Sequence, residues 1–175
     1  MKFTELPIKG AFLIECEEKV DARGSFARQF CKKEFLNHGI DFDIKQCNIS
    51  KNYKAGVLRG LHYQKEPYLE QKLVSCVKGS LYNVIVDLRK DSPSYMKWHA
   101  AELSEKNNSI LYIPKECAHG FQTLADNTVI FYQLSEYFMP EHYDGLRWND
   151  PKLAIKWPEC ENRLINERDM NYELL

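Results

Sequence analysis

Short segments rich in β-branched and aromatic residues follow one another along most of the chain, and turn-forming residues separate them. This pattern constrains the fold more than any other feature, because it leaves little room for long helices. The segments cover residues 11–16, 25–31, 43–50, 57–64, 71–77, 80–87, 97–103, 109–113, 119–124 and 128–137. Their length and spacing predict an all-β fold, most simply a jelly-roll double sheet.

Only two segments favour a helix. Residues 32–38 form the first, which Gly39 ends. Residues 150–155 form the second, after a capping pattern in WNDP. We therefore expect a few short helices beside the sheets.

The dipeptide Lys78-Gly79 separates two strong strand segments, 71–77 and 80–87. A two-residue turn of this kind predicts a β-hairpin. No repeat, linker or low-complexity stretch interrupts the chain, so the prediction is one domain over residues 1–175.

Charge and composition exclude several classes of protein. The chain has 24 Lys+Arg against 25 Asp+Glu, a net charge of −1. With no basic stripe, nucleic acid and anionic membranes are not expected partners. The N-terminus carries charges throughout, so neither a signal peptide nor a membrane span is predicted.

The cysteines stand singly and form no CxxC pair. They are Cys16, Cys31, Cys47, Cys76, Cys117 and Cys160. This arrangement predicts reduced, buried thiols and a cytoplasmic location, and it gives little support to disulfides or a zinc site.

The segment VLRGLHYQ places Arg59 and His62 close together in a predicted strand. Strict alternation would point the two side chains to opposite faces. A β-bulge at Gly60 would turn both to the same face. Both arrangements are open from the sequence.

Small jelly rolls often hold a metal on a His-x-His pair and a distant histidine. Here the pair is His62 and Gln64, with His119 downstream, and an amide is a poor ligand for a transition metal. The sequence therefore predicts no metal and no other cofactor.

Nine runs spread over the chain resemble the dTDP-4-dehydrorhamnose 3,5-epimerase family, in its order and close to its spacing. They are DARGSF, VLRGLHYQ, QKLV, VDLRKDSPSYMKW, LYIPKECAHGF, FYQLSEYFMPE, GLRWNDP, IKWP and INERDMNYELL. The resemblance implies a cupin-type jelly roll without a catalytic metal, and a homodimer. It also implies an isomerase whose substrate is a nucleotide-linked 4-keto-6-deoxyhexose, inverted at C3 and C5.

The resemblance assigns four catalytic residues. His62 matches the base, and Asp169 matches the carboxylate that hydrogen-bonds it and is expected to raise its pKa. Lys72 matches the cation near the keto oxygen, where it would stabilise an enolate. Tyr132 matches the proton donor on the opposite face of the sugar.

Further matches imply contacts with the substrate. Arg23 and Arg59 match diphosphate-binding arginines, whose guanidinium groups suit phosphate oxygens. Gln46 and Asn48 match polar residues that line the pocket, and His119 matches another contact.

Four positions bear on the nucleotide. Arg168 lies where the family has a basic residue. Three positions depart from the family: Arg28 replaces a glutamate, Phe138 replaces the tyrosine that stacks on thymine, and Tyr143 replaces a second glutamate. A reversed charge changes which partner a site selects, so the nucleotide stays open.

Three alternatives remain. A 3-epimerase shares nearly all catalytic residues, and the same chemistry on another nucleotide-linked keto sugar is compatible with the departures. A sugar-binding cupin without catalysis has no need of the paired His62 and Asp169. Neither the pathway nor its product, such as a surface polysaccharide or an antibiotic sugar, follows from the sequence.

Overall fold

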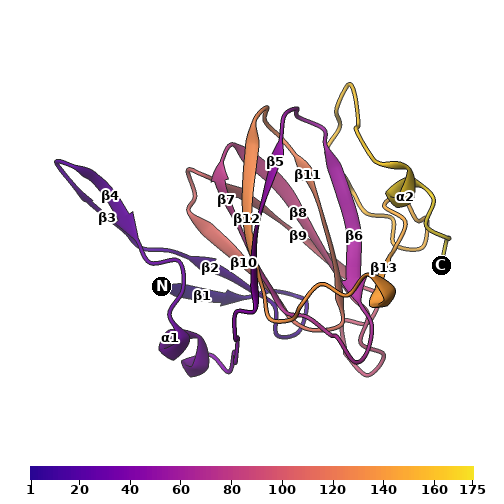
Figure 1. Ribbon diagram of the computed structural model, residues 1–175, viewed down its shortest axis with the longest axis horizontal. Coiled ribbons are helices and arrows are strands. Elements are labelled where there is room, and N and C mark those ends of the chain that lie inside the picture. The colour runs from indigo at the N-terminus through magenta and orange to yellow at the C-terminus, as the bar shows by residue number, and fades with distance from the viewer.

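Residues 1–175 form two antiparallel β-sheets packed face to face in the computed structural model (Figure 1). The six-stranded sheet has the order β1 (Lys2–Glu5), β2 (Phe12–Glu15), β10 (Ser109–Ile113), β7 (Lys72–Lys78), β12 (Thr128–Leu134) and β5 (Gln46–Asn52). The five-stranded sheet has the order β13 (Tyr143–Gly145), β6 (Leu58–Gln64), β11 (Cys117–Thr123), β8 (Ser80–Asp87) and β9 (Trp98–Ser104). The all-β prediction is confirmed.

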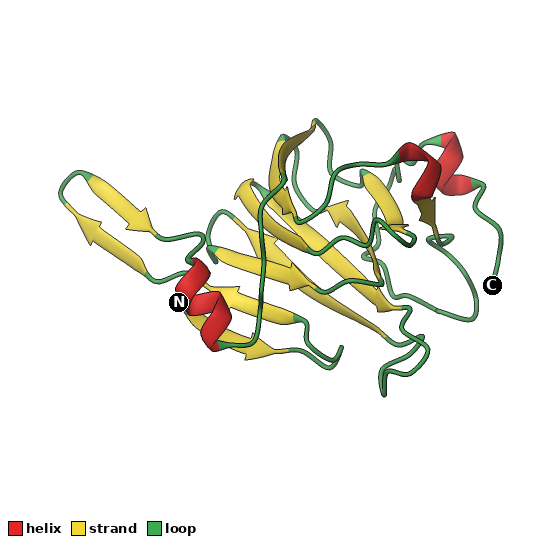
Figure 2. Cartoon of the chain, turned by 60° about the horizontal axis from the view of Figure 1, so that its bottom comes forward, coloured by secondary structure: helices red, strands yellow, loops and turns green.

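Three short helices and one separate hairpin complete the chain (Figure 2). The helices are α1 (Lys32–Asn37), the 3-10 helix η1 (Pro140–His142) and α2 (Glu167–Met170). Strands β3 (Glu18–Asp21) and β4 (Gly24–Ala27) pair only with each other and project from the double sheet. We call this hairpin the arm. None of the helices has the length and apolar character needed to cross a membrane.

The main core lies between the two sheets. Alternate residues of each strand point inward, so Val74 and Cys76 of β7 meet Leu81 and Ile85 of β8. Each such side chain contributes about 1.5–3 kcal/mol when fully buried. This apolar core occupies part of the space between the sheets, and buried polar side chains such as Lys72 and Asn83 occupy another part.

Each sheet also buries part of its outer face. Phe35 of α1 and Phe42 pack on the outside of the six-stranded sheet. Leu146 and Leu153 from the C-terminal segment cover the outside of the five-stranded sheet. These contacts hold the C-terminal segment against the five-stranded sheet, and α2, farther along this segment, lies beside β6.

The predicted helix at 32–38 is confirmed as α1, whereas the one at 150–155 is wrong. Ala154 takes a left-handed backbone conformation, with φ of 49°, after a single turn. The Asp150 side chain accepts hydrogen bonds from the backbone N–H of Lys152 and of Leu175, at 2.7 Å each. The segment is therefore a turn that fastens the C-terminus, and the second helix is α2.

The predicted hairpin at Lys78-Gly79 is also wrong. Strand β7 lies in one sheet and β8 in the other, so the chain crosses between layers here. Gly79 makes this possible, because its φ is +78° and a Cβ would come within 2.6 Å of the Thr128 hydroxyl oxygen. Local turn chemistry cannot distinguish a hairpin from a corner between two sheets.

The cysteines are unpaired, but they are not all buried as predicted. Cys16, Cys76 and Cys117 are buried, whereas Cys47 and Cys160 are exposed. Cys47 lies on β5, where the alternation of the strand turns its side chain outward while its neighbours face inward.

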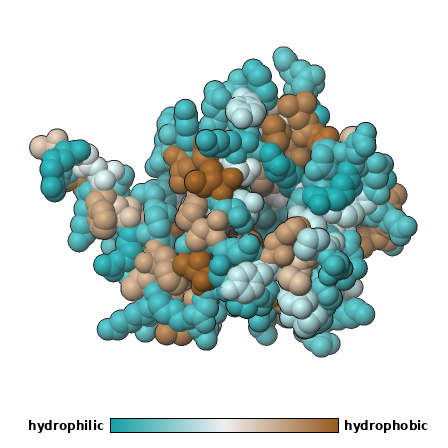
Figure 3. Space-filling model, viewed as in Figure 1, coloured by the Kyte–Doolittle hydropathy of each residue, from teal (hydrophilic) through white to brown (hydrophobic).

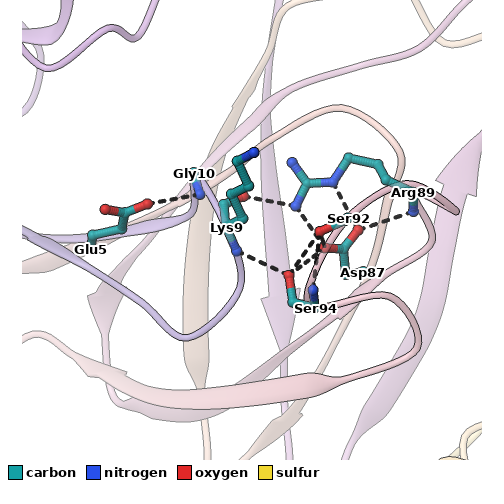
Figure 4. Close-up of polar contacts among 7 residues, drawn as sticks. All are labelled: Glu5, Lys9, Gly10, Asp87, Arg89, Ser92 and Ser94. Atoms are coloured by element: carbon teal, nitrogen blue, oxygen red, sulfur yellow. Dashed lines mark hydrogen bonds and ion pairs between the residues drawn. The ribbon is translucent and has the colours of Figure 1, made fainter.

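A buried carboxylate joins the N-terminal loop to the loop after β8 (Figure 4). Arg89 donates to both oxygens of Asp87, at 2.8 Å each, and Ser92 and Ser94 donate to Oδ2. Arg89 also donates to the carbonyl of Lys9 at 2.7 Å. Although burial opposes the charge, these donors lower the pKa of Asp87 to about 2.

Asp87→Asn should lower the free energy of unfolding at neutral pH by about 2–4 kcal/mol, because charged hydrogen bonds of a buried group are lost. The native pKa of about 2 lies below the ordinary 3.8, so the carboxylate stabilises the fold above pH 3.8. The difference between variant and wild type should therefore shrink as the pH falls toward 2.

Chemical denaturation over this pH range measures the effect. The control is Glu15→Gln, which breaks an exposed ion pair with Lys2 and should cost no more than about 1 kcal/mol. An equal loss in both variants would contradict the role of the Asp87 network.

Candidate active site

A cavity of about 450 Å³ lies between the inner faces of the two sheets. Strands β5, β7 and β12 form one wall, β6 and β11 form the other, and α2 closes one side. The lining residues are Gln46, Asn48, Ser50, Arg59, His62, Glu70, Lys72, Val74, His119, Phe121, Ile130, Tyr132, Leu134, Phe138, Tyr143, Asn166, Arg168 and Asp169.

A bulge in β6 brings Arg59 and His62 to this cavity. His62 pairs with His119 and Arg59 with Phe121, so Gly60 and Leu61 together oppose the single Gly120. Gly60 has a φ of +110°, and a Cβ there would come within 2.6 Å of the Gly120 backbone. The bulge that the sequence allowed is confirmed.

His62 and Asp169 are directly hydrogen-bonded, although they are 107 positions apart. The distance from His62 Nε2 to Asp169 Oδ1 is 2.9 Å, and the other carboxylate oxygen accepts from the backbone N–H of Gly60 at 2.9 Å. A carboxylate acceptor requires a proton on Nε2, so Nδ1 is the basic nitrogen of the neutral ring.

The expectation of a raised pKa for His62 is wrong. Burial lowers its pKa below 6.5 and outweighs Asp169, and the charges of Lys72 and Arg168 lower it further. The hydrogen bonds from His62, Gly60 and Arg168 lower the pKa of Asp169, although burial alone would raise it. Near neutral pH the pair is thus an uncharged imidazole beside a carboxylate.

Lys72 lies on the opposite wall and is nearly buried. Its Nζ is 2.9 Å from Glu70 Oε1, and both side chains are less than a tenth exposed. Glu70 was not predicted from the sequence. Its position carried a signal, because Glu70 lies two residues before Lys72 and residues two apart in an extended chain point to the same face.

Tyr132 faces the cavity from β12. It pairs across the sheet with Asn48 on one side and Val74 on the other, so these three positions share the inner face. Burial raises the pKa of its phenol above 10. Tyr132 therefore keeps its proton at neutral pH and can act as a proton donor.

His119 pairs with His62 across β6 and β11 and contacts Asn83 of β8. Its Nε2 lies 2.5 Å from Asn83 Oδ1. Burial lowers the pKa of His119 well below 6.5, with help from the charges of Lys72 and His62. The ring is neutral under physiological conditions.

Aromatic rings and cations gather at the mouth of the cavity. The rings of Phe138 and Tyr143 meet edge to face with centroids 5.1 Å apart, and Arg168 lies 5.0 Å from the Tyr143 ring. Gln46 accepts a hydrogen bond from the backbone N–H of Phe138 at 2.5 Å, which fixes that segment. Arg59 is exposed here and donates to Asn52 at 3.0 Å.

Two residues that the resemblance marks as substrate contacts, Arg23 and Arg28, do not reach the cavity of their own chain. Arg23 lies at the tip of the arm, is fully exposed to solvent and pairs with Asp21. Arg28 pairs with Glu34 of α1 at 3.0 Å. The arm, whose turn contains Arg23, projects away from the double sheet (Figure 1), and Arg28 directly follows the last residue of β4.

Gln64, the poor metal ligand of the sequence motif, has a structural role. Its side chain is buried and donates to the carbonyls of Tyr68 and Tyr137, and it accepts from the backbone N–H of Met139. It holds two loops at the mouth and does not line the cavity. Asn166 and Ser50 line the cavity and were not predicted. Asn166 lies in the run INERDMNYELL, and Ser50 shares the inward face of β5 with Gln46 and Asn48, so both positions carried a signal.

The His62 pKa can be measured directly by NMR titration of histidine-labelled protein, with His62→Gln to assign the signal. It should lie below 6.5 in the wild type. Asp169→Asn should lower it further, because the carboxylate stabilises the imidazolium. Lys72→Gln should raise it, because a neighbouring cation is removed. Shifts of the same sign in both variants would contradict this electrostatic balance.

Comparison with known proteins gives one consistent family. A family model described as dTDP-4-dehydrorhamnose 3,5-epimerase matches residues 5–175. A protein of that name from Sinorhizobium fredii is 41% identical over 169 residues, covering 97% of this chain and 87% of the relative. The Bacillus anthracis enzyme of that name, solved with TDP and PPi bound, superposes with a TM-score of 0.95 at 39% identity, covering 99% of each chain. A 3'-monoepimerase from Streptomyces bikiniensis, in complex with dTDP-quinovose, has a TM-score of 0.90 at 30% identity, covering 97% of this chain and 85% of that one.

Proposed function

Because this chain belongs to the dTDP-4-dehydrorhamnose 3,5-epimerase family, we propose that the cavity between its sheets is the active site of such an isomerase. The substrate is dTDP-4-dehydro-6-deoxy-D-glucose and the product is dTDP-4-dehydro-L-rhamnose. The observation that carries the proposal is the placement of His62 with Asp169 on one wall, facing Lys72 and Tyr132 on the other.

The chemistry needs a base and an acid on opposite faces of the sugar. The hydrogens on C3 and C5 flank the 4-keto group, so each can leave as a proton if the enolate is stabilised. Nδ1 of His62 takes the proton, and the C–H electron pair moves into the enolate. Lys72 stabilises the enolate oxygen, and Tyr132 returns a proton to the carbon from the far side.

The resting protonation states support these roles. His62 is neutral because burial lowers its pKa, so its Nδ1 is free to accept a proton. Tyr132 is protonated because burial raises its pKa. Each inversion leaves a proton on His62 and removes one from Tyr132, and solvent restores both groups. The inverted carbon therefore acquires hydrogen from solvent.

The mouth of the cavity suits a nucleoside diphosphate. Arg59 and Arg168 are exposed cations that can pair with phosphate oxygens. Phe138 and Tyr143 offer ring faces and edges to a base. The relative solved with TDP bound supports thymidine as the nucleoside.

Incubation with dTDP-4-dehydro-6-deoxyglucose in heavy water tests the function, with incorporated deuterium counted by mass spectrometry. We expect two deuterons per product. His62→Gln should lower turnover by about 10²- to 10⁴-fold, as expected for loss of a general base. Tyr132→Phe should still exchange one proton slowly but give little net inversion.

The outcomes separate the alternatives. One deuteron would indicate a 3-epimerase, and a solved relative with the same fold is named a 3'-monoepimerase. No deuteron would contradict the proposed substrate, and the same assay with other nucleotide-linked keto sugars would then test the nucleotide. Wild-type exchange in His62→Gln would contradict its role as base.

The arm supports a homodimer. A two-stranded hairpin is marginal by itself, yet Val20 and Phe26 of the arm are 75% and 68% exposed. In Figure 3 the arm projects at the left, with apolar and polar atoms side by side on its surface. Strand β5 ends the six-stranded sheet and exposes Ile49 at 63%. A second copy whose arm lies across β5 would cover both surfaces. Since β5 also lines the cavity, Arg23 of the partner subunit would then reach the substrate diphosphate.

Mixing two inactive variants tests this arrangement. Arg23→Ala and His62→Gln should each be impaired alone. After equal mixing, about half of the dimers would combine the two variants and hold one intact site out of two, so about a quarter of the wild-type activity should return. Lys19→Ala removes another exposed cation of the arm and should have little effect. A monomer by light scattering, or no recovery on mixing, would contradict the shared site.

A cytoplasmic location fits the cysteines. All six are unpaired, and two are exposed, which suits a reducing compartment.

A further inference from the structure

Asn83 is a polar residue behind His119, among core residues and outside the set that lines the cavity. It lies on β8 between Leu81 and Ile85, both members of the main core, and it is 0% exposed. A buried amide is costly unless its hydrogen bonds are formed. Asn83 Nδ2 has no hydrogen-bond partner, and the one hydrogen bond of this side chain joins Oδ1 to Nε2 of His119.

His119 has one ring nitrogen left for a ligand. Nε2 faces Asn83, whereas Nδ1 forms no hydrogen bond within the chain and is not among the buried, unpartnered atoms. Because His119 lines the cavity, Nδ1 is the nitrogen accessible from it. What Nδ1 can do for a substrate depends on whether it carries the proton.

The groups that face His119 keep it uncharged. His62 on β6 and Lys72 on β7 are the nearby titratable cations, and together with burial they lower its pKa well below 6.5. The cavity also holds Arg59, Glu70, Arg168 and Asp169. A neutral imidazole carries a single proton, so the tautomer decides whether Nδ1 donates or accepts.

The carboxamide of Asn83 can select either tautomer, because a half-turn about its last bond exchanges oxygen and nitrogen. With Oδ1 against the ring, Nε2 must carry the proton, Nδ1 is bare, and both Nδ2 hydrogens stay unpaired. With Nδ2 against the ring, Nδ2 donates one hydrogen to Nε2, Nδ1 carries the ring proton, and the unpaired groups are one Nδ2 hydrogen and the carbonyl oxygen. Unpaired buried carbonyl oxygens are less rare than unpaired N–H groups, so the second arrangement costs less.

We propose that Asn83 is a positioning residue that donates from Nδ2 to His119 Nε2 and thereby presents Nδ1–H of a neutral His119 to the cavity. This inference rests on the proposed function. The keto oxygen of the sugar can only accept a hydrogen bond, and Nδ1–H can donate to it. Asn83 fixes the direction of that donor without touching the substrate.

Asn83→Asp distinguishes this role from simple packing. A carboxylate only accepts, so it requires the proton on Nε2 and raises the pKa of His119 by stabilising the imidazolium. Nδ1 then carries a proton only in the imidazolium. Turnover should therefore be retained at low pH and should fall as the pH rises through the new His119 pKa, whereas wild type shows no such loss.

Nitrogen-15 NMR of histidine-labelled, ligand-free protein reads the tautomer directly, with His119→Phe to assign the signals. We expect wild-type His119 to be neutral and protonated on Nδ1 across pH 6–8. Asn83→Asp should move the neutral form to Nε2–H. Asn83→Leu should give a mixture and lower kcat by at least about tenfold with a smaller change in KM, since one donor becomes disordered.

Gln122→Glu is the matched control, a buried amide-to-carboxylate change on β11 whose partners are Arg163 and the Pro158 carbonyl. It should leave the His119 signals unchanged. A wild-type His119 protonated on Nε2, or an unchanged tautomer in Asn83→Asp, would overturn the proposal. These readouts need no substrate, so they stand apart from the deuterium assay that tests the function.

Discussion

The Asp169 carboxylate ties the reactive part of this molecule together. One oxygen accepts from His62 Nε2 and the other from the backbone of Gly60, so a single buried group holds both the base and the bulge beside it. It also fastens α2, from the far end of the chain, to β6. Without that contact the bulge would lose a hydrogen bond within the fold and His62 would lose the acceptor that sets its tautomer.

The buried ionisable groups inside this double sheet have polar partners, some from the same segment and some from distant ones. Lys72 is paired with Glu70, His62 with Asp169, and His119 with Asn83. Burial makes each pair stronger and also keeps both histidines neutral. The same desolvation that costs stability thus prepares a base that is free to accept a proton at neutral pH.

The catalytic roles that we propose are divided between the two walls of the cavity. His62 and His119 come from the five-stranded sheet, whereas Lys72 and Tyr132 come from the six-stranded sheet. In the proposed reaction, a substrate held between the sheets would meet a base on one side and a proton donor on the other. The double-sheet architecture supplies the two-sided geometry that inversion at carbon requires, and the arm remains available to extend the site from a second copy.

Strand alternation and turn residues were enough to predict an all-β chain and α1, because these depend on contacts close in sequence. The motifs also marked most cavity residues, including Asp169. They could not show that Arg23 and Arg28 lie outside the cavity of their own chain, they did not mark Glu70, and the turn residues at Gly79 wrongly predict a hairpin. Three features depend on atoms distant in sequence. They are the sheet that each strand joins, the balance between burial and Asp169 that sets the His62 pKa, and the contact of the Asn83 side chain with His119. Only the tertiary structure decides these, because desolvation and hydrogen bonding act through space and not along the chain.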